Sequence, residues 1–246
     1  MGINRIDENT TSKPFDGVIK TLLTGKETGS KMLSVNLFEL EPSSKSNYYE
    51  ISNVEESLFV VDGRVEFRLG NKIFNASKGD AILAKKGESH GFGNAGKSNA
   101  IILTVSPNIK VDNIVVEEPE FIHETPTIGY FDRSNNDPYE FTPGVMRYDM
   151  VGDFLGAEST CISELICDPN GIAPNHYHPK HEESMYCLEG KLNFSYAEED
   201  DITLSQGDMF TCEVAVRHGF YNGHKTTGRL LAIHSVLNPP PRIDVD

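Results

Sequence analysis

Residues 175–190 read NHYHPKHEESMYCLEG, and this stretch contains most of the candidate metal ligands of the chain. It carries three of the eight histidines and three acidic residues. His176 and His178 stand one residue apart, so on a β-strand their side chains point to the same face. A turn after them would return Glu182 or Glu183 to that face. Two imidazoles and a carboxylate that converge in this way are typical of a divalent-cation site, and we expect a fourth ligand from elsewhere in the chain.

Short runs of β-forming residues recur along the chain between turn signals. Residues 32–40 alternate in polarity, and Asp62-Gly63 separates two β-rich runs as a hairpin turn does. Turn signals recur at intervals of roughly ten residues, and no long segment has the helical period. The pattern predicts an all-β protein built as a sandwich or barrel. Residues 1–31 are expected to form an irregular arm or an edge strand, and residues 107–144 a linker with one or two strands.

The second half of the chain repeats features of the first half at a nearly constant offset. The recurring pairs are Gly63 and Gly190 at 127 positions, and Gly79-Asp80 and Gly207-Asp208, His90 and His218, and Asn94 and Asn222, each at 128 positions. This regularity predicts an internal duplication with two copies of one β domain. We therefore divide the chain into a first domain, residues 1–115, and a linker with a second domain, residues 116–246.

The repeat also supplies the missing ligand. His218 follows a strand that a closed sheet would bring beside residues 175–190. The candidate metal ligands are therefore His176, His178, Glu183 and His218, with Glu182 as the alternative carboxylate. Imidazole and carboxylate ligands suit Fe, Mn, Ni, Cu or Zn, so we expect one divalent transition metal in the second domain. Four protein ligands leave positions for water, dioxygen or a chelating substrate.

The residues around these ligands resemble the cupin superfamily. Its first motif, G(X)5HXH(X)3,4E(X)6G, is met by His176, His178, Glu183 and Gly190, and the six residues before Gly190 favour Glu183 over Glu182. The resemblance covers both halves of the chain. It implies a bicupin, two tandem double-stranded β-helix or jelly-roll barrels of the quercetinase-like type. It also implies that His176, His178, Glu183 and His218 are the metal ligands.

The second cupin motif, G(X)5PXG(X)2H(X)3N, is met by Gly207, His218 and Asn222 at full spacing. The departures from the two motifs are Asn170 at the leading glycine of the first, and Glu213 and Ala215 at the proline and second glycine of the second. These positions shape turns and supply no ligand, so the expected metal site is unaffected.

The first copy lacks the paired histidines. It matches the second motif at Gly79, Gly87, His90 and Asn94, with Lys85 in place of the proline, and it keeps Glu56 of the first motif. Counting back from Glu56 gives Tyr49 and Ile51 where the histidines should stand. Isoleucine cannot bind a cation, so the first barrel is predicted to carry a degenerate site without metal.

The alternation of side chains along the ligand strands predicts the substrate pocket. Met185 shares the face of Glu183, while Phe220 and Asn222 share the face of His218. An apolar, polarisable wall beside a redox-capable ion favours a metal-dependent dioxygenase that cleaves a small aromatic or enol or diketone compound, with Glu183 as ligand and proton acceptor. The alternatives are a redox-neutral cupin enzyme (isomerase, decarboxylase or aminohydrolase) and a non-catalytic ligand-binding cupin. Oxalate-type decarboxylation is less favoured because the first copy has lost its ligands.

Bulk composition limits the partners. A net charge of −15 argues against nucleic acid, and no apolar run is long enough for a membrane span. The first residues lack an apolar core, so we expect no signal peptide, a cytoplasmic location and four free cysteines. The expected partner is a small-molecule substrate, and edge strands make a homodimer plausible.

Several remaining residues have no motif context. His181 is expected on the surface, with a supporting acid or base role as the alternative, and His123, His224 and His234 have no assigned role. Arg217 should point away from the metal. The tail from Asn238, NPPPRIDVD, is expected to lie across a neighbouring barrel or to be disordered, because its prolines cannot continue a strand.

Overall fold

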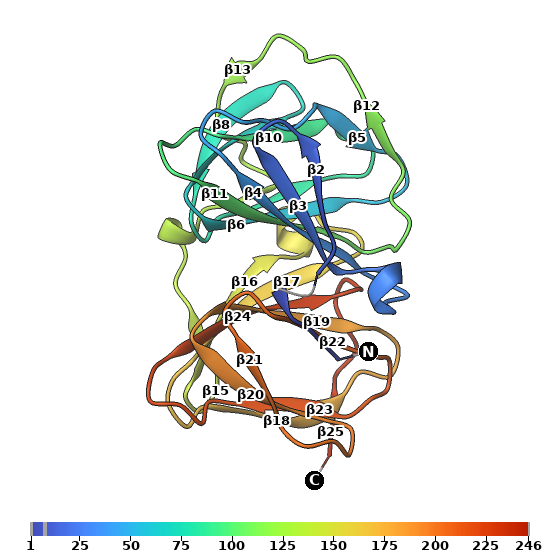
Figure 1. Ribbon diagram of the computed structural model, residues 1–246, viewed down its shortest axis with the longest axis vertical. Coiled ribbons are helices and arrows are strands. Elements are labelled where there is room, and N and C mark those ends of the chain that lie inside the picture. The colour runs from blue at the N-terminus through green and yellow to red at the C-terminus, as the bar shows by residue number, and fades with distance from the viewer. Residues whose placement is uncertain (1, 7–8, 246) are drawn as a thin grey trace.

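The short β-forming runs fold into two barrels, each built from two facing sheets with apolar side chains between them. The computed structural model describes residues 2–6 and 9–245. In Figure 1 the first barrel, blue to green, lies above the second, yellow to red. The prediction of an all-β chain with two tandem jelly-roll barrels is confirmed.

The first barrel contains a seven-stranded and a six-stranded sheet. In hydrogen-bonding order the larger sheet holds β14 (Tyr130–Phe131), β9 (Ala81–Ala84), β6 (Glu56–Asp62), β11 (Ala100–Ser106), β4 (Ser34–Leu40), β3 (Val18–Thr24) and β2 (Thr11–Phe15). The smaller sheet holds β12 (Asn113–Val115), β5 (Tyr49–Ile51), β10 (His90–Asn94), β7 (Arg64–Leu69), β8 (Lys72–Ser77) and β13 (Ile122–His123). The hairpin predicted at Asp62-Gly63 joins β6 and β7, and Gly63 has the left-handed φ of 85° that such a turn needs.

The second barrel repeats this plan with a seven-stranded and a five-stranded sheet. The larger sheet holds β1 (Ile3–Asn4), β22 (Met209–Cys212), β19 (Glu183–Glu189), β24 (Gly228–His234), β17 (Cys161–Cys167), β16 (Val145–Val151) and β15 (Tyr139–Thr142). The smaller sheet holds β21 (Ile202–Ser205), β20 (Lys191–Tyr196), β23 (His218–Tyr221), β18 (Ile172–Tyr177) and β25 (Ile243–Asp244). Short 3-10 helices lie at Lys26–Thr28, Arg133–Asn135 and Asp153–Leu155.

Strand pairing crosses the predicted domain boundary at 115/116 in both directions. β13 and β14 follow that boundary in the sequence, yet they pair with β8 and β9 of the first barrel. In the opposite direction, β1 leaves the first domain and pairs with β22 of the second barrel, with Ile3 opposite Phe210. Residues 1–31 therefore contribute three strands to two different sheets, where an arm or one edge strand was expected.

Apolar side chains fill both barrels and also the space between them. Val60 and Phe67 lie in the first barrel, and Cys187 and Phe194 in the second. A further cluster, the inter-barrel core, joins the two larger sheets through residues such as Leu37, Phe59, Leu103, Ile162, Tyr186 and Leu231. Because each larger sheet is apolar on both faces, the barrels are held together by a hydrophobic layer of the same kind as their interiors.

Two buried glutamates connect the barrels reciprocally. Glu182 accepts hydrogen bonds from Ser30 Oγ at 2.7 Å, from Lys31 N at 3.0 Å and from Met32 N at 3.0 Å. At the equivalent position of the first copy, Glu55 accepts hydrogen bonds from the backbone N–H groups of residues 158 and 159 at 2.7 and 2.8 Å. Each carboxylate thus satisfies backbone donors of the opposite barrel, which makes charge-assisted bonds across the interface.

Candidate metal centre

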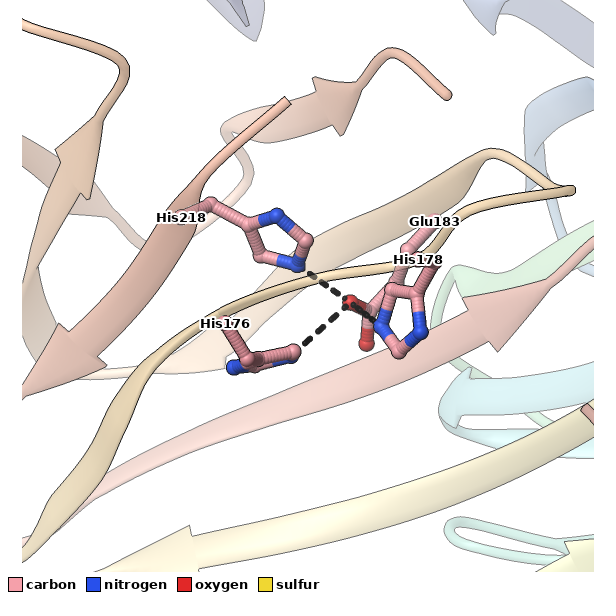
Figure 2. Close-up of side chains that lie close together, drawn as sticks. All are labelled: His176, His178, Glu183 and His218. Carbon is pink, nitrogen blue, oxygen red and sulfur yellow. Dashed lines mark hydrogen bonds and ion pairs between the residues drawn. The ribbon is translucent and has the colours of Figure 1, made fainter. Parts of the chain in front are cut away.

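Four predicted residues converge inside the second barrel. His176 lies on β18, His178 follows that strand, Glu183 begins β19 and His218 begins β23. Pro174 interrupts the pairing of β18 with β23, because proline has no N–H for the ladder, and the register shifts between Ala173 and His176. After this irregularity His176 stands directly opposite His218. Figure 2 shows the three imidazole rings grouped around the carboxylate of Glu183.

The donor atoms face one another at short range. Glu183 Oε2 lies 2.8 Å from His218 Nε2, 3.0 Å from His178 Nε2 and 4.0 Å from His176 Nε2 (Figure 2). One ligand atom from each of the four residues lies within 4.8 Å of the others. All four side chains are buried. A buried group of three nitrogens and one carboxylate oxygen is a typical ligand set for a divalent transition metal.

Backbone carbonyls fix the tautomer of two of the histidines. His176 Nδ1 donates to the carbonyl oxygen of Pro174 at 2.8 Å, and His218 Nδ1 donates to that of Val216 at 2.9 Å. With Nδ1 committed to a carbonyl oxygen, Nε2 is the atom of each ring that faces Glu183, and it would bind a metal once it carries no proton. Such supporting bonds orient metal-ligating histidines in proteins.

Burial and mutual charge set the protonation of the cluster. Burial lowers the pKa of His176 to about 4, so this ring is neutral near pH 7. Burial alone would raise the pKa of Glu183, but His234 and the hydrogen bonds from His178 and His218 hold it well below its usual value. Burial would lower the pKa of His218, but the hydrogen bond to Glu183 and its charge raise it. A carboxylate beside a neutral imidazole is the protonation state that metal binding requires.

The structure separates the two candidate carboxylates. Glu183 lies among the imidazoles, whereas both oxygens of Glu182 accept hydrogen bonds from the first barrel. Alternation along β19 places these neighbours on opposite faces of the sheet. The residues therefore fit a metal held by His176, His178, Glu183 and His218, with Glu182 committed to the interface.

His181 and His234 extend the site, contrary to expectation. His181 was expected on the surface, but it is fully buried, and its Nε2 lies 3.1 Å from His234 Nδ1. His234 Nε2 lies 3.6 Å from Glu183 Oε1, and its ring centroid is 5.1 Å from that of His178. Burial and neighbouring imidazoles lower the pKa of His181 to about 3, and burial lowers that of His234 to about 4. The two rings therefore extend the imidazole cluster from His178.

Sequence comparison missed His234 for an identifiable reason. The register places it opposite both Cys161 and Glu183, at the position that Ser106 occupies in the first barrel. A search for features shared by the two copies passes over a histidine that only one copy has. The same offset of 128 would have marked the position once β24 was aligned with β11.

A cavity of about 370 Å³ opens beside the ligand cluster. Its lining includes the four expected ligands, His234, and the predicted pocket residues Met185 and Phe220. Two arginines, Arg147 and Arg242, also line it. The cavity therefore combines an apolar wall with two positively charged side chains. The sequence did not predict these arginines as pocket residues.

Asn222 lies outside the lining of that cavity. Its side-chain nitrogen donates to the carbonyl oxygens of Cys167 and Thr226 at 2.8 and 2.9 Å, and its Oδ1 accepts from the His224 N–H at 3.0 Å. Asn94 makes the equivalent bonds in the first barrel. This asparagine fixes the turn after β23, because its amide satisfies backbone groups that the turn leaves unpaired.

The C-terminal tail covers its own barrel and not a neighbouring one. β25 pairs with β18, with Asp244 opposite His176, so a short strand forms after the prolines. The residues 239–242 line the cavity between Leu237 and this strand. The prolines need no hydrogen-bonding partner, and they carry the chain across the mouth of the cavity.

The first barrel keeps two residues of ligand type, Glu56 and His90, at the equivalent position. Tyr49 hydroxyl and His90 Nε2 lie 2.7 and 2.9 Å from Glu56 Oε2, and Ile51 takes the place of His178. Within the described residues, the groups of side chains that could hold a metal lie in the second barrel. Hydrogen bonds among Tyr49, Glu56 and His90 occupy the position that corresponds to the candidate metal site.

The four cysteines, at 161, 167, 187 and 212, are free thiols as expected.

Comparison with known proteins agrees with this architecture. A family model for the cupin domain matches residues 36–106 and 164–234. A search of curated proteins returned no match. The structure of Lactobacillus farciminis oxalate decarboxylase, a formate complex, is similar with a TM-score of 0.81 at 14% identity, over 100% of this chain and 88% of that chain. Bacillus subtilis oxalate decarboxylase at pH 4.6 gives 0.80 at 14% identity, over 100% and 78%. At this identity the likeness establishes the shared fold alone.

No helix among the described residues is long and apolar enough to span a membrane.

Proposed function

This chain belongs to the cupin family, with one cupin domain in each half, and we propose that its second barrel is a metal-dependent active site for a small organic acid. The reaction we favour is redox-neutral loss of carbon dioxide from that acid. This is the decarboxylase member of the redox-neutral alternative, and it takes precedence over the dioxygenase that the sequence favoured. One divalent transition metal per chain, held by His176, His178, Glu183 and His218, is part of the proposal.

The observation that carries the proposal is the pair of arginines. Arg147 and Arg242 both lie against the ring of Phe141, with guanidinium carbons 5.2 and 5.6 Å from its centroid. Arg147 Nε donates to Asp149 at 2.7 Å, and Arg242 Nε donates to Asp244 at 2.8 Å. Within the described part of the chain their terminal nitrogens have no hydrogen-bonding partner. These nitrogens remain available to a carboxylate, which guanidinium groups bind in a bidentate manner.

Each part of the site has a distinct task in this proposal. The arginines bind and orient the substrate carboxylate toward the imidazole cluster, and the apolar side chains Leu165, Met185 and Phe220 exclude water from the remainder of the substrate. A bound divalent metal would supply Lewis-acid polarisation of the substrate. Glu183 Oε1, which neither His178 nor His218 engages, is the atom we assign to take the proton from the acid group of the incoming substrate and to return it to carbon when carbon dioxide leaves.

The names of the structural neighbours support the same class of substrate. Both are oxalate decarboxylases, and one was solved as a formate complex, so these proteins act on or bind small carboxylates. The apolar wall formed by Met185 and Phe220 favours a second candidate, the oxidative cleavage of a larger enol or diketone compound. The two candidates differ in their need for dioxygen.

The first experiment measures metal and turnover together. Purified protein should contain about one transition metal per chain by elemental analysis, and His176→Ala should lose it. The metal-loaded protein should then release carbon dioxide from a panel of mono- and dicarboxylic acids at equal rates with and without air. Turnover of diketones or enols that stops without dioxygen would reverse the order of the two candidates.

The arginines are tested by substitution. Arg147→Gln and Arg242→Gln should each raise KM for the acid about tenfold or more, since a charge-assisted hydrogen bond is worth roughly 1.5–3 kcal/mol. Arg217→Gln is the matched control, because Arg217 adjoins His218 in sequence but does not line the cavity. Unchanged KM in both cavity variants would refute recognition of a carboxylate.

A further inference from the structure

The first barrel contains a cavity of its own. Its volume is about 280 Å³, and it lies where the second barrel has its metal cavity, between β4, β5, β6, β10 and β11. Tyr49, Ile51 and Glu56, the counterparts of three ligands in the second barrel, line it. The duplication has therefore kept the space after the ligands were replaced.

Internal bonds close the former metal position. Glu56 Oε2 is shared by the hydroxyl of Tyr49 and Nε2 of His90, while Ile51 brings a hydrocarbon side chain into the cavity. Glu56 Oε1 has no hydrogen-bonding partner among the described residues. One carboxylate oxygen thus remains an open acceptor at the base of the cavity.

The polar wall beside Glu56 is unpartnered. The register pairs Ser106 with Ser34 and Thr104 with Asn36, and it pairs Val105 with Ser57, the neighbour of Glu56. Asn36, Thr104 and Ser106 are only 9%, 2% and 3% exposed, and all three line the cavity. Within the described residues none of their side chains makes a hydrogen bond. Buried polar groups are normally paired, and an unpaired one costs roughly 1–3 kcal/mol.

Aromatic rings complete the lining from both sheets. Phe38 lies two positions after Asn36 on β4, while Tyr49 and Phe92 belong to the smaller sheet. Phe38 and Phe92 meet edge to face at a centroid distance of 5.2 Å, and all three rings line the cavity. A pocket that combines apolar rings with a few convergent polar groups is the usual form of a small-molecule site.

We propose that the first barrel binds a neutral, polyhydroxylated small molecule of monosaccharide size, without a metal. A hydroxyl group both donates and accepts, so several hydroxyls on one ligand can satisfy the open oxygen of Glu56, the amide of Asn36 and the hydroxyls of Thr104 and Ser106 together. The C–H faces of such a ligand pack on Phe38 and Phe92. This site is independent of the reaction proposed for the second barrel.

Charge around the cavity favours a neutral ligand. Among the described residues that line it, Glu56 is the acidic group and Lys20 the ammonium group. Lys20 Nζ lies 5.6 Å from the centroid of Phe38 and has no carboxylate partner within the described chain. The two charges offset one another, whereas the second cavity combines two arginines with its carboxylate.

Binding is measured by ligand-detected saturation-transfer NMR on the full chain. We expect saturation transfer to myo-inositol or D-glucose, and at least tenfold weaker binding of D-glucuronate and D-glucosamine, which add one charge of either sign. The same measurement on His176→Ala, which removes a proposed metal ligand in the other barrel, should give unchanged binding.

Two substitutions locate the site. Thr104→Val keeps the shape of the side chain but removes the hydroxyl, and Ser106→Ala removes the neighbouring one; each should weaken binding about tenfold. Ser57→Ala is the matched control. Ser57 lies beside Glu56 but pairs with Leu83 and Val105 of the inter-barrel core, so it faces away from the cavity. Thermal unfolding of each variant checks that the fold is kept.

Four results of these experiments would contradict the proposed site or the proposed ligand. Absence of saturation transfer to both neutral compounds would overturn the proposal. Binding as tight as that of the wild type by folded Thr104→Val and Ser106→Ala would overturn it too. Tighter binding of either charged analogue would overturn the assignment of a neutral ligand. Loss of binding in His176→Ala would place the ligand in the second barrel and overturn the proposed site.

Discussion

Ala215 holds a backbone conformation that glycine adopts in the other barrel. Its φ is 61°, and Gly87, its counterpart in the first copy, has a φ of 74°. The N–H of Ala215 donates to the carbonyl oxygen of His178 at 2.8 Å, so this turn holds a candidate ligand in place. A left-handed conformation costs a residue with a Cβ roughly 1–2 kcal/mol, and this cost is borne next to the metal centre.

Replacing each residue by the type found in the other barrel tests the backbone strain at Ala215. Ala215→Gly should raise the free energy of unfolding by about 1 kcal/mol, and Gly87→Ala should lower it by a similar amount. Urea denaturation followed by circular dichroism gives both values. A destabilised Ala215→Gly would show that the methyl group contributes more by packing than it costs in strain.

Asp149 connects the cavity to the pH dependence of stability. Burial works in the opposite direction, but Arg147, Tyr139 and Ser163 hold the pKa of Asp149 below its usual value. A carboxyl whose pKa is lower in the folded state stabilises the fold above its unfolded pKa. This contribution is lost as the pH falls through the folded pKa.

The variant Asp149→Asn should therefore be less stable than the wild type near pH 7. The expected loss is about 0.5–1 kcal/mol, since the pair is partly exposed and screened by solvent. The difference should shrink toward zero as the pH falls through the lowered folded pKa of Asp149, because Asp149 is then protonated in both states. Urea unfolding at a series of pH values measures it, and a difference that stays constant with pH would contradict the assigned charge effect.

At the scale of elements, the tail from Asn238 acts as a cover. β25 attaches it to β18 beside His176, and Arg242 brings one of the two cavity cations with it. Because the strand contains two residues and makes few hydrogen bonds, the cover depends on contacts across the cavity mouth as well as on pairing.

Deletion of residues 238–246 should leave the metal in place but weaken carboxylate binding. We expect about tenfold lower affinity for acetate in the metal-loaded protein, measured by calorimetry. Full-length Arg242→Gln is the control that separates the loss of charge from the loss of cover. If the truncated protein binds acetate as tightly as the intact one, the tail is not part of the binding site.

Sequence patterns predicted the elements of each barrel better than the segments between them. The hairpins, the duplication and the family were confirmed because glycine turns and strand periodicity are local signals. β25 was not predicted, and β1 and β14 lie in the segments 1–31 and 107–144, where an edge strand and one or two strands were expected without a position. Each of the three has two residues and pairs with a distant strand. At the site, the motif spacing identified His176, His178, Glu183 and His218, which the structure brings together. His234 lay outside the motifs, and Arg242 lay in a tail whose prolines indicated no strand.

At the scale of the whole molecule, the reciprocal glutamates tie one barrel to the other. Glu55 and Glu182 are 3% and 2% exposed, and each accepts backbone N–H bonds from the opposite barrel. Glutamine keeps the shape but replaces one acceptor oxygen with an NH2 group that faces another donor. Its introduction should therefore leave buried donors unsatisfied.

Glu55→Gln and Glu182→Gln should each lower the free energy of unfolding by about 1.5–3 kcal/mol. Urea denaturation provides the measurement, and Glu66→Gln, on the partly exposed side of β7, is the control. Losses no larger than that of the control would mean that the inter-barrel core alone holds the barrels together.

The pairing of β1 with β22 has a consequence for how the protein is made. Ile3 and Asn4 are synthesised roughly 200 residues before their partners Phe210 and Met209. At about 5–20 residues per second, the interval is on the order of ten to forty seconds. During that time the first barrel can close while β1 waits without a partner. β1 is thus made before the first barrel but fixed after it, and it completes a sheet whose other strands are made later.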